Sequence, residues 1–138
     1  MAANTEPIYS RRPAVQWGGS ALTAANTAKD GTGTVLTVFT ADATEGSYIE
    51  KVVFRAAGTN VATVARVFIN NGSTNATPAN NVLVSEITLP ATTLSETSAL
   101  APVELLVNAG INAGYKINVA LGTAVAAGYY ISVFGGDY

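Results

Sequence analysis

The chain has 138 residues and a formal net charge of −2, from 7 Lys and Arg residues against 9 Asp and Glu residues. This length suits one domain, and a composition with 49% apolar and only 12% charged residues excludes intrinsic disorder. The chain has no cysteine and no histidine, which excludes disulfides, thiolate nucleophiles, a Ser-His-Asp triad and the usual zinc sites.

Residues 1–13 are expected to form an extended N-terminal arm ahead of the folded domain. Pro7 and Pro13 exclude a regular helix in this segment. Its apolar groups can dock by burial and its arginines on the carboxylates of a neighbouring subunit, although solvent exposure is the alternative for the arginines. The candidate contact residues in the arm are Ile8, Tyr9, Arg11 and Arg12.

From residue 14 to residue 138 the sequence predicts one β domain. Apolar and β-branched residues alternate with polar residues in short segments, which are separated by Gly, Asn and Pro. The predicted strands are 14–17, 34–40, 47–56, 62–70, 82–89, 103–107, 115–121 and 129–134. Eight short strands without a long helix predict an all-β antiparallel sandwich, jelly-roll-like, with a closed barrel as the alternative.

The alternation also assigns side chains to the two faces of each strand. In 115–121 we expect one set inside the core and the other on the outer face. The inner set is Tyr115, Ile117, Val119 and Leu121, and the outer set is Lys116, Asn118 and Ala120. In 82–89 the charge of Glu86 places Leu83, Ile87 and Leu89 on the inner face.

Two segments depart from simple alternation. In 47–56, Val52 and Phe54 point inward. Regular alternation would then place Ile49 on the outer face, which predicts a bulge near Glu50 or a second buried face. Of the two helix-compatible windows, 20–29 is rich in Ala but weakened by Thr and Asn. The second, 91–101, is rich in Thr and Ser and lies between Pro90 and Pro102, so we expect an irregular crossing there.

The sequence contains no constellation typical of catalysis. The Gly-rich stretch 30–34 precedes a strand, whereas a phosphate-binding loop follows a strand and opens a helix, so this stretch is interpreted as a turn. Among the nine carboxylates, Asp42 and Glu45 are the only plausible cation pair, and a solvated turn explains them better. We therefore expect no enzyme activity, no cofactor and no metal.

The exposed aromatic side chains point instead to binding. Tyr129 and Tyr130 place one ring on each face of a strand, so one of the two rings faces away from the core unless that face is covered. Protein interfaces favour Tyr and Trp, while a carbohydrate platform and ordinary core filling are the alternatives. The further candidate contacts are Trp17, Tyr130 and Tyr138.

Five segments, 24–33, 52–60, 63–72, 86–96 and 128–138, together resemble the small structural proteins of tailed-bacteriophage heads. The capsid decoration, or cement, proteins are the members of this class that the chain resembles. The resemblance implies a β-sandwich on the outside of the capsid, often a homotrimer, that bridges major capsid subunits and stabilises the head. It implies no particular site residue.

The expected partners are therefore the major capsid protein and further copies of this chain. No nucleic acid, membrane or small-molecule substrate is expected, because the charge is near neutral and no apolar run approaches the ~18 residues of a membrane-spanning helix. The first residues lack the pattern of a secretory signal, so we expect synthesis in the host cytoplasm and location on the virion. A tail or neck component, a carbohydrate-binding β-sandwich module and an uncharacterised enzyme are the alternatives.

Overall fold

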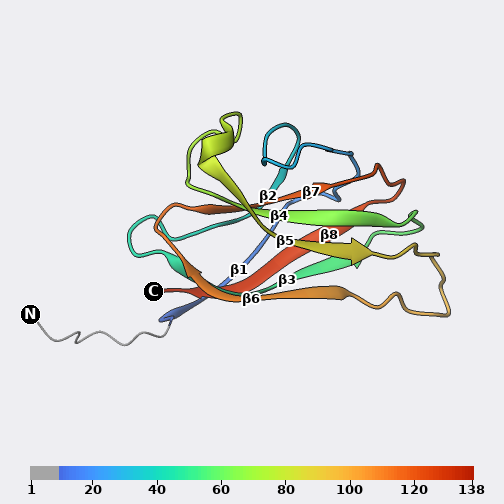
Figure 1. The fold of residues 1–138 in the computed structure, drawn as a ribbon. Helices are drawn as coiled ribbons and strands as arrows, with labels where there is room; N and C mark the ends of the chain where they lie inside the picture. The colour runs from blue at the N-terminus through green and yellow to red at the C-terminus, as the bar shows by residue number, and fades with distance from the viewer. Residues whose placement is uncertain (1–9) are drawn as a thin grey trace, which may run out of the picture.

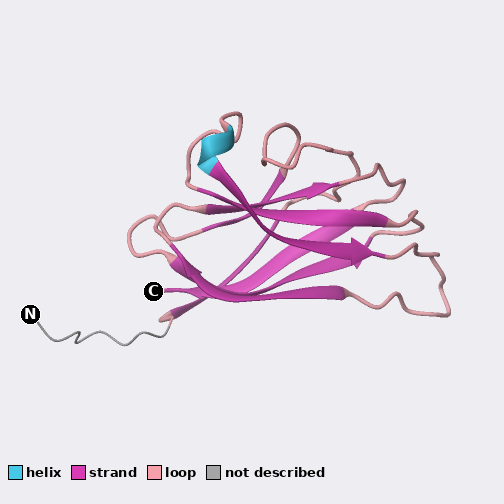
Figure 2. Ribbon diagram, in the orientation of Figure 1, coloured by secondary structure: helices cyan, strands magenta, loops and turns pink. Residues whose placement is uncertain are grey.

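Eight β-strands form where the side chains alternate, as this computed structural model shows for residues 10–138, which are the residues it describes. The strands are β1 (Arg12–Trp17), β2 (Leu36–Thr40), β3 (Ser47–Ala56), β4 (Thr63–Asn70), β5 (Asn81–Leu89), β6 (Val103–Ile111), β7 (Lys116–Leu121) and β8 (Tyr129–Asp137). The three-residue 3-10 helix η1 (Pro78–Asn80) precedes β5, and loops make up the rest of the described chain (Figure 2).

The strands form two four-stranded antiparallel sheets, β1-β8-β3-β6 and β2-β7-β4-β5, which pack face to face (Figure 1). The first strand pairs with the eighth, the second with the seventh, the third with the sixth and the fourth with the fifth. The chain is thus one long antiparallel hairpin that folds over on itself. The additional pairs β3–β8 and β4–β7 join neighbouring parts of this hairpin, one pair in each sheet. This is the jelly-roll order, so the predicted all-β antiparallel sandwich is confirmed.

The core lies between the two sheets and is built from the inward-facing residues of each strand. In β7 the predicted inner residues Ile117, Val119 and Leu121 are buried there, because alternate side chains of a strand point to the same face. Ile87 and Leu89 of β5 also pack on the core, as predicted.

Two bulges decide which residues face the core. The predicted bulge at Glu50 is confirmed, since the register of β3 with β8 shifts between Ile49 and Lys51. A second bulge, which the alternation does not reveal, lies at Val84 and shifts the register of β5. The prediction that Leu83 faces the core is therefore wrong: Leu83 pairs with Phe68, and both lie outside the core cluster.

Loops cover the outer face of the sheet β2-β7-β4-β5. Asn118 and Ala120 lie on this outer face, as predicted, but they are only 3% and 0% exposed, so the face is not open to solvent there. The loop between β1 and β2 runs along β7, where the backbone N–H of Asn26 donates to the carbonyl of Leu121. The loop that contains η1 stands beside it, and the Asn75 amide nitrogen donates to backbone carbonyls of the β1–β2 loop (Figure 1).

The sandwich begins earlier than the sequence predicts. β1 starts at Arg12, and the backbone N–H of Arg11 already donates to the carbonyl of Asp137, so the predicted boundary at residue 13 is two residues late. Pro13 fits into β1 because this strand is at the edge of its sheet, where a missing N–H is tolerated. The rest of the predicted arm, residues 1–9, lies outside the described residues.

Candidate protein-binding face

The outer face of the sheet β1-β8-β3-β6 carries a set of exposed apolar side chains. Residues paired across neighbouring strands lie on the same face, and the registers align two rows across the sheet. One row is Trp17, Ser132, Val53 and Glu104, and the other is Val15, Phe134, Lys51 and Leu106. The apolar face, as we call it, consists of Val15, Trp17, Val53, Leu106, Tyr130 and Phe134.

Three members of the apolar face are strongly exposed: Trp17 at 67%, Leu106 at 66% and Tyr130 at 57%. The outer face of an antiparallel sheet is usually polar when it meets water, and contiguous exposed apolar patches mark interaction sites. The opposite sheet has loops over its outer face, whereas no described loop is bonded across the apolar face. The apolar face is therefore available to a partner.

The two tyrosines at the start of β8 divide between the faces, as predicted. Tyr129 is buried in the core, where its hydroxyl donates to the carbonyl of Pro90 at 3.3 Å, and burial raises the pKa of this hydroxyl. Tyr130 projects from the opposite side of the strand onto the apolar face. The alternation of the strand alone accounts for this difference.

The charges on the apolar face are largely compensated. The ammonium of Lys51 lies 3.1 Å from a carboxylate oxygen of Glu104, and it also lies 5.7 Å from the centre of the Phe134 ring. Arg55 of β3 lies opposite Tyr130 of β8 in the strand register, so its side chain is on the same face. A partner surface on this face therefore meets aromatic and aliphatic groups, the Lys51–Glu104 ion pair at the centre and the Arg55 side chain at the end near Tyr130.

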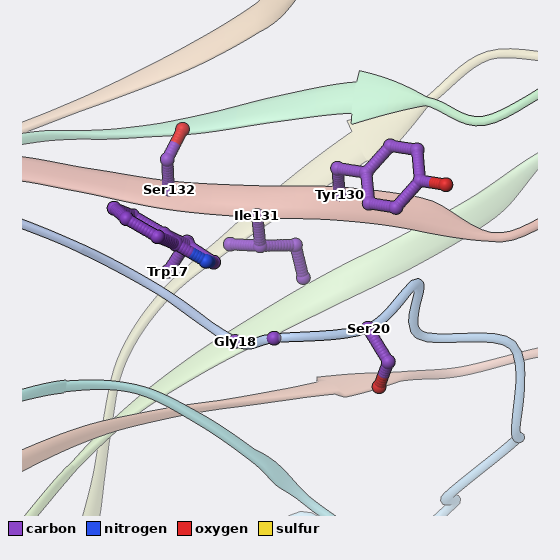
Figure 3. Close-up of a pocket in the computed structure, with 7 residues that line it drawn as sticks. Trp17, Gly18, Ser20, Tyr130, Ile131 and Ser132 are labelled. Carbon is purple, nitrogen blue, oxygen red and sulfur yellow. The ribbon is translucent and has the colours of Figure 1, made fainter.

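A shallow pocket of about 340 Å³ lies at one end of the apolar face, between Trp17 and Tyr130 (Figure 3). The two rings come from neighbouring strands and flank Ile131, because Trp17 is opposite Ser132 in the register and Tyr130 is two residues away. Ser20 and the glycines that follow β1 complete its lining. No charged side chain lines it among the described residues, so its surface suits apolar or neutral polar groups.

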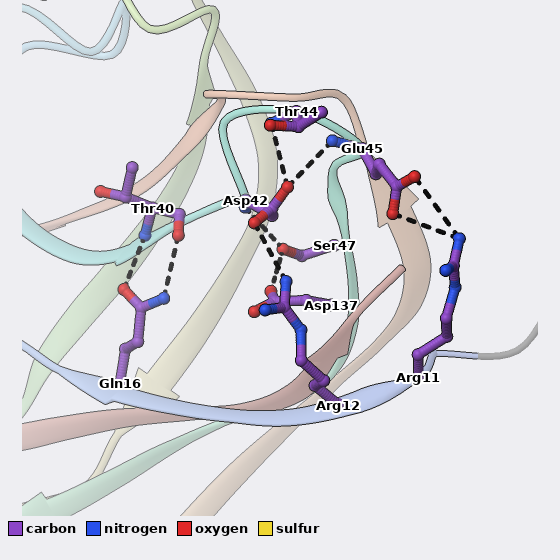
Figure 4. Close-up of polar contacts among 9 residues, drawn as sticks. All are labelled: Arg11, Arg12, Gln16, Thr40, Asp42, Thr44, Glu45, Ser47 and Asp137. Atoms are coloured by element: carbon purple, nitrogen blue, oxygen red, sulfur yellow. Dashed lines mark hydrogen bonds and ion pairs between the residues drawn. The ribbon is translucent and has the colours of Figure 1, made fainter.

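The two arginines of the predicted arm contact carboxylates of their own chain (Figure 4). The Arg11 guanidinium lies 3.4 Å from Glu45, and that of Arg12 lies 3.3 Å from Asp42, both in the loop between β2 and β3. Within the chain these contacts join β1 to this loop, and docking of Arg11 and Arg12 on a neighbouring subunit stays a prediction. Asp42 and Glu45 likewise act as the partners of arginines and not as a cation pair.

Asp42 also caps a tight turn, and its protonation is expected to weaken the fold in acid. Its Oδ1 accepts the backbone N–H groups of Thr44 and Glu45, each at 2.9 Å. The N–H of Glu45, then that of Thr44, and the Arg12 guanidinium lower the pKa of Asp42 below its ordinary value of 3.8. Because folding lowers this pKa, the stabilisation is complete above about pH 4 and is lost as the pH falls through the folded-state pKa.

We expect thermal melting at pH 7 to rank wild type above Asp42→Asn, and Asp42→Asn above Asp42→Ala. The asparagine keeps an acceptor for the two N–H groups of the turn and loses only the charge that faces Arg12. The gap between wild type and Asp42→Asn should narrow as the pH falls below 3.8 and close below the lowered pKa of folded Asp42. If the gap stays constant with pH, the carboxylate charge has no role in stability.

The remaining candidate contacts lie apart from the Trp17 pocket. Tyr138 follows β8 and is half-buried, with its ring so close to Gly110 that a side chain there would meet the hydroxyl. Its backbone N–H donates to the carbonyl of Gly46, so Tyr138 lies at the same end of the sheet as Arg12. Ile8 and Tyr9 lie outside the described residues.

The structure therefore brings together two of the predicted contact residues, Trp17 and Tyr130, and adds four that the sequence analysis did not select. These are Val15, Val53, Leu106 and Phe134. For Leu106 and Phe134 the sequence contains a signal. β6 and β8 have apolar residues on both faces, whereas a strand with one solvated face requires them only on the other face.

Within residues 10–138, no group of three or more Asp or Glu side chains is close enough to hold a metal ion. Nor does this part of the chain contain a helix long and apolar enough to cross a membrane. The chain matches no protein-family model, no curated protein and no solved structure.

Proposed function

We propose that this protein is a structural virion subunit, a decoration or cement protein that binds the outside of a phage capsid and bridges major capsid subunits. The observation that carries the proposal is the uncovered apolar face, on which the central strand β8 presents Tyr130, 57% exposed, and Phe134, 36% exposed. Covering such side chains with a partner surface removes apolar area from water. The sequence resemblance supplies the identity of the partner.

The proposed role is non-catalytic. Four carboxylates of the described residues lie in ion pairs: Asp42 and Glu45 bind arginines, Glu104 binds Lys51, and Glu86 binds Arg66. The Trp17 pocket is lined by aromatic, glycine and serine residues, and no acid or base lies among them. These features suit recognition by shape and apolar contact.

A rigid sheet face suits cementing. Both strands at the centre of the sheet, β8 and β3, are hydrogen-bonded on each side, so the side chains that they present keep fixed positions. Tyr130 and Phe134 stand on β8 and are expected to be the main anchors, because energetically dominant contacts gather near the centre of an interface and are enriched in aromatic residues. The protein then stabilises the head by holding two capsid subunits at a fixed spacing.

The direct test is binding to purified phage heads assembled without this protein. The double variant Tyr130→Ala/Phe134→Ala should bind about a hundredfold more weakly than wild type, as measured by co-sedimentation at increasing concentration. The matched control is Val61→Ala/Leu94→Ala, which removes two apolar side chains of comparable exposure from loops outside this face and should bind like wild type. Equal binding by both variants would contradict the proposed face.

Failure of the wild-type protein to bind heads would contradict the capsid role itself. Antibody labelling of whole virions by electron microscopy then separates the tail or neck alternative, because label on the tail in place of the head assigns the chain to that structure.

The Trp17 pocket favours one second candidate, a carbohydrate-binding module. Exposed Trp and Tyr rings combine an apolar surface with a polar edge, and serine hydroxyls and bare glycine backbone complete the lining. A glycan array that gives a signal with wild type, and none with Tyr130→Ala, would support this function. An array without signal for wild type would exclude the glycans displayed.

A further inference from the structure

A groove of about 250 Å³ opens along the edge of the sandwich where β5 and β6 lie. It is lined by residues of three strands: Val67 and Ile69 of β4, Val84 and Ser85 of β5, and Leu105, Leu106, Val107 and Ala109 of β6. Ser85 is the only polar residue among the described residues that line it. Several of the apolar lining residues pack on the core and yet remain partly exposed, so the core is open to solvent at this edge.

Both strand edges beside the groove are interrupted by a bulge. Val84 is the extra residue in β5, between Ser85 and Leu83, and β6 contains an extra residue next to Asn108, whose φ is 49°. A bulge breaks the regular ladder of backbone groups that an additional strand would need. The groove therefore suits an apolar side chain better than an added strand.

The surroundings of the groove carry no uncompensated charge from β5 or β6. The single acidic residue of β5, Glu86, lies 2.7 Å from Arg66, and that of β6, Glu104, lies 3.1 Å from Lys51. An occupant that is itself uncharged can therefore approach without leaving an unpaired charge in the contact.

The same chain presents an uncharged apolar anchor at its opposite edge. Trp17 lies on β1, which is separated from β6 by the whole width of the sheet, and its side chain is 67% exposed. The residues next to it in sequence, Gln16 and Gly18, carry no charge. Tryptophan is enriched among the residues that anchor interfaces by filling apolar pockets. We propose that the groove between β5 and β6 binds the Trp17 side chain of a second copy of this chain.

This contact is head to tail, because its two halves lie on opposite edges of one subunit. Repeated head-to-tail contacts close into a ring when the rotation between copies allows it, so the expected assembly is a closed ring of copies of this chain. Tyr130 and Phe134 stay available to another partner. The contact between copies does not depend on the proposed capsid role, and the two are tested separately.

The test is the oligomeric state of the full chain, measured by sedimentation velocity over a range of concentrations. Wild type should form an oligomer in which each chain contributes one Trp17 side chain and one groove. Trp17→Ala and Val84→Glu should each raise the dissociation constant at least about thirty-fold. The matched control is Val82→Glu, which adds the same charge to the same strand at an exposed position outside the groove lining and should leave assembly unchanged.

Mixing the two defective variants provides the decisive measurement. Trp17→Ala keeps an intact groove and Val84→Glu keeps an intact anchor, so an equimolar mixture should form a dimer with one chain of each kind and no larger species. Trp17 is the only tryptophan in the chain, and its fluorescence should shift to shorter wavelength in this dimer. A monomeric wild type, an oligomer insensitive to Trp17→Ala, equal effects of Val82→Glu and Val84→Glu, or no dimer in the mixture would each overturn the inference.

Discussion

Replacing Phe54 with alanine is expected to lower the free energy of unfolding by about 3–5 kcal/mol. Phe54 lies in β3, the strand that pairs with both β6 and β8, and its side chain is 0% exposed in the core between the sheets. Removal of the ring leaves a cavity that neighbours from both sheets line, and the hydrogen-bonded strands cannot move enough to fill it. Urea denaturation followed by circular dichroism measures the change.

The control for this prediction is Phe134→Ala on the same sheet. Phe134 faces outward and is 36% exposed, so its removal should cost less than about 1 kcal/mol. This control also shows whether the variants used in the head-binding test remain folded. Equal losses at Phe54 and Phe134 would mean that the two faces of the sheet are not the inner and outer faces described above.

Replacing Asn60 with alanine is expected to cost about 2–4 kcal/mol of stability, although Asn60 lies in a loop. Its side chain is 3% exposed and makes bonds in both directions. The amide nitrogen donates to the carbonyl of Gly128 at 3.0 Å, and Oδ1 accepts the N–H groups of Ala127 and Gly128 at 2.9 and 2.8 Å. Alanine removes the acceptor of the Ala127 and Gly128 N–H groups, whereas the Gly128 carbonyl keeps its bond from the Ala57 N–H.

Asn112→Ala is the matched control, because Asn112 is an exposed loop asparagine and its substitution should change stability by less than about 0.5 kcal/mol. Thermal melting of the two variants gives the comparison. Gly128 directly precedes Tyr129 and Tyr130, so Asn60→Ala is also expected to loosen the start of β8. An Asn60→Ala protein as stable as wild type would mean that water replaces the lost bonds.

The candidate face could be predicted only in part. Trp17 and Tyr130 can be predicted because aromatic residues are enriched at interfaces, and the structure places them beside each other. Leu106 and Phe134 cannot, because an apolar residue on either face of a strand can belong to a core. The partners of Arg11 and Arg12 could not be predicted either, because the carboxylates of the β2–β3 loop come close to them only when β1 pairs with β8.

The sequence by itself determined the eight strands, the absence of a long helix and most of the core. The signals for these features are local: alternation with a period of two, the turn residues between strands, and the parity shift at Ile49 that marks the bulge at Glu50. Each follows from the geometry of a single strand, which does not depend on which strand lies beside it.

Only the tertiary structure decided the order of the strands and which outer face is covered. Asn118 and Ala120 face outward in a strand like any other, yet the β1–β2 loop reaches β7 and excludes water from their face of the sheet. Leu83 points away from the core because the bulge at Val84 shifts the register of β5 with β4. These outcomes depend on pairing between segments far apart in the chain, and residue spacing within one segment carries no information about its distant neighbours.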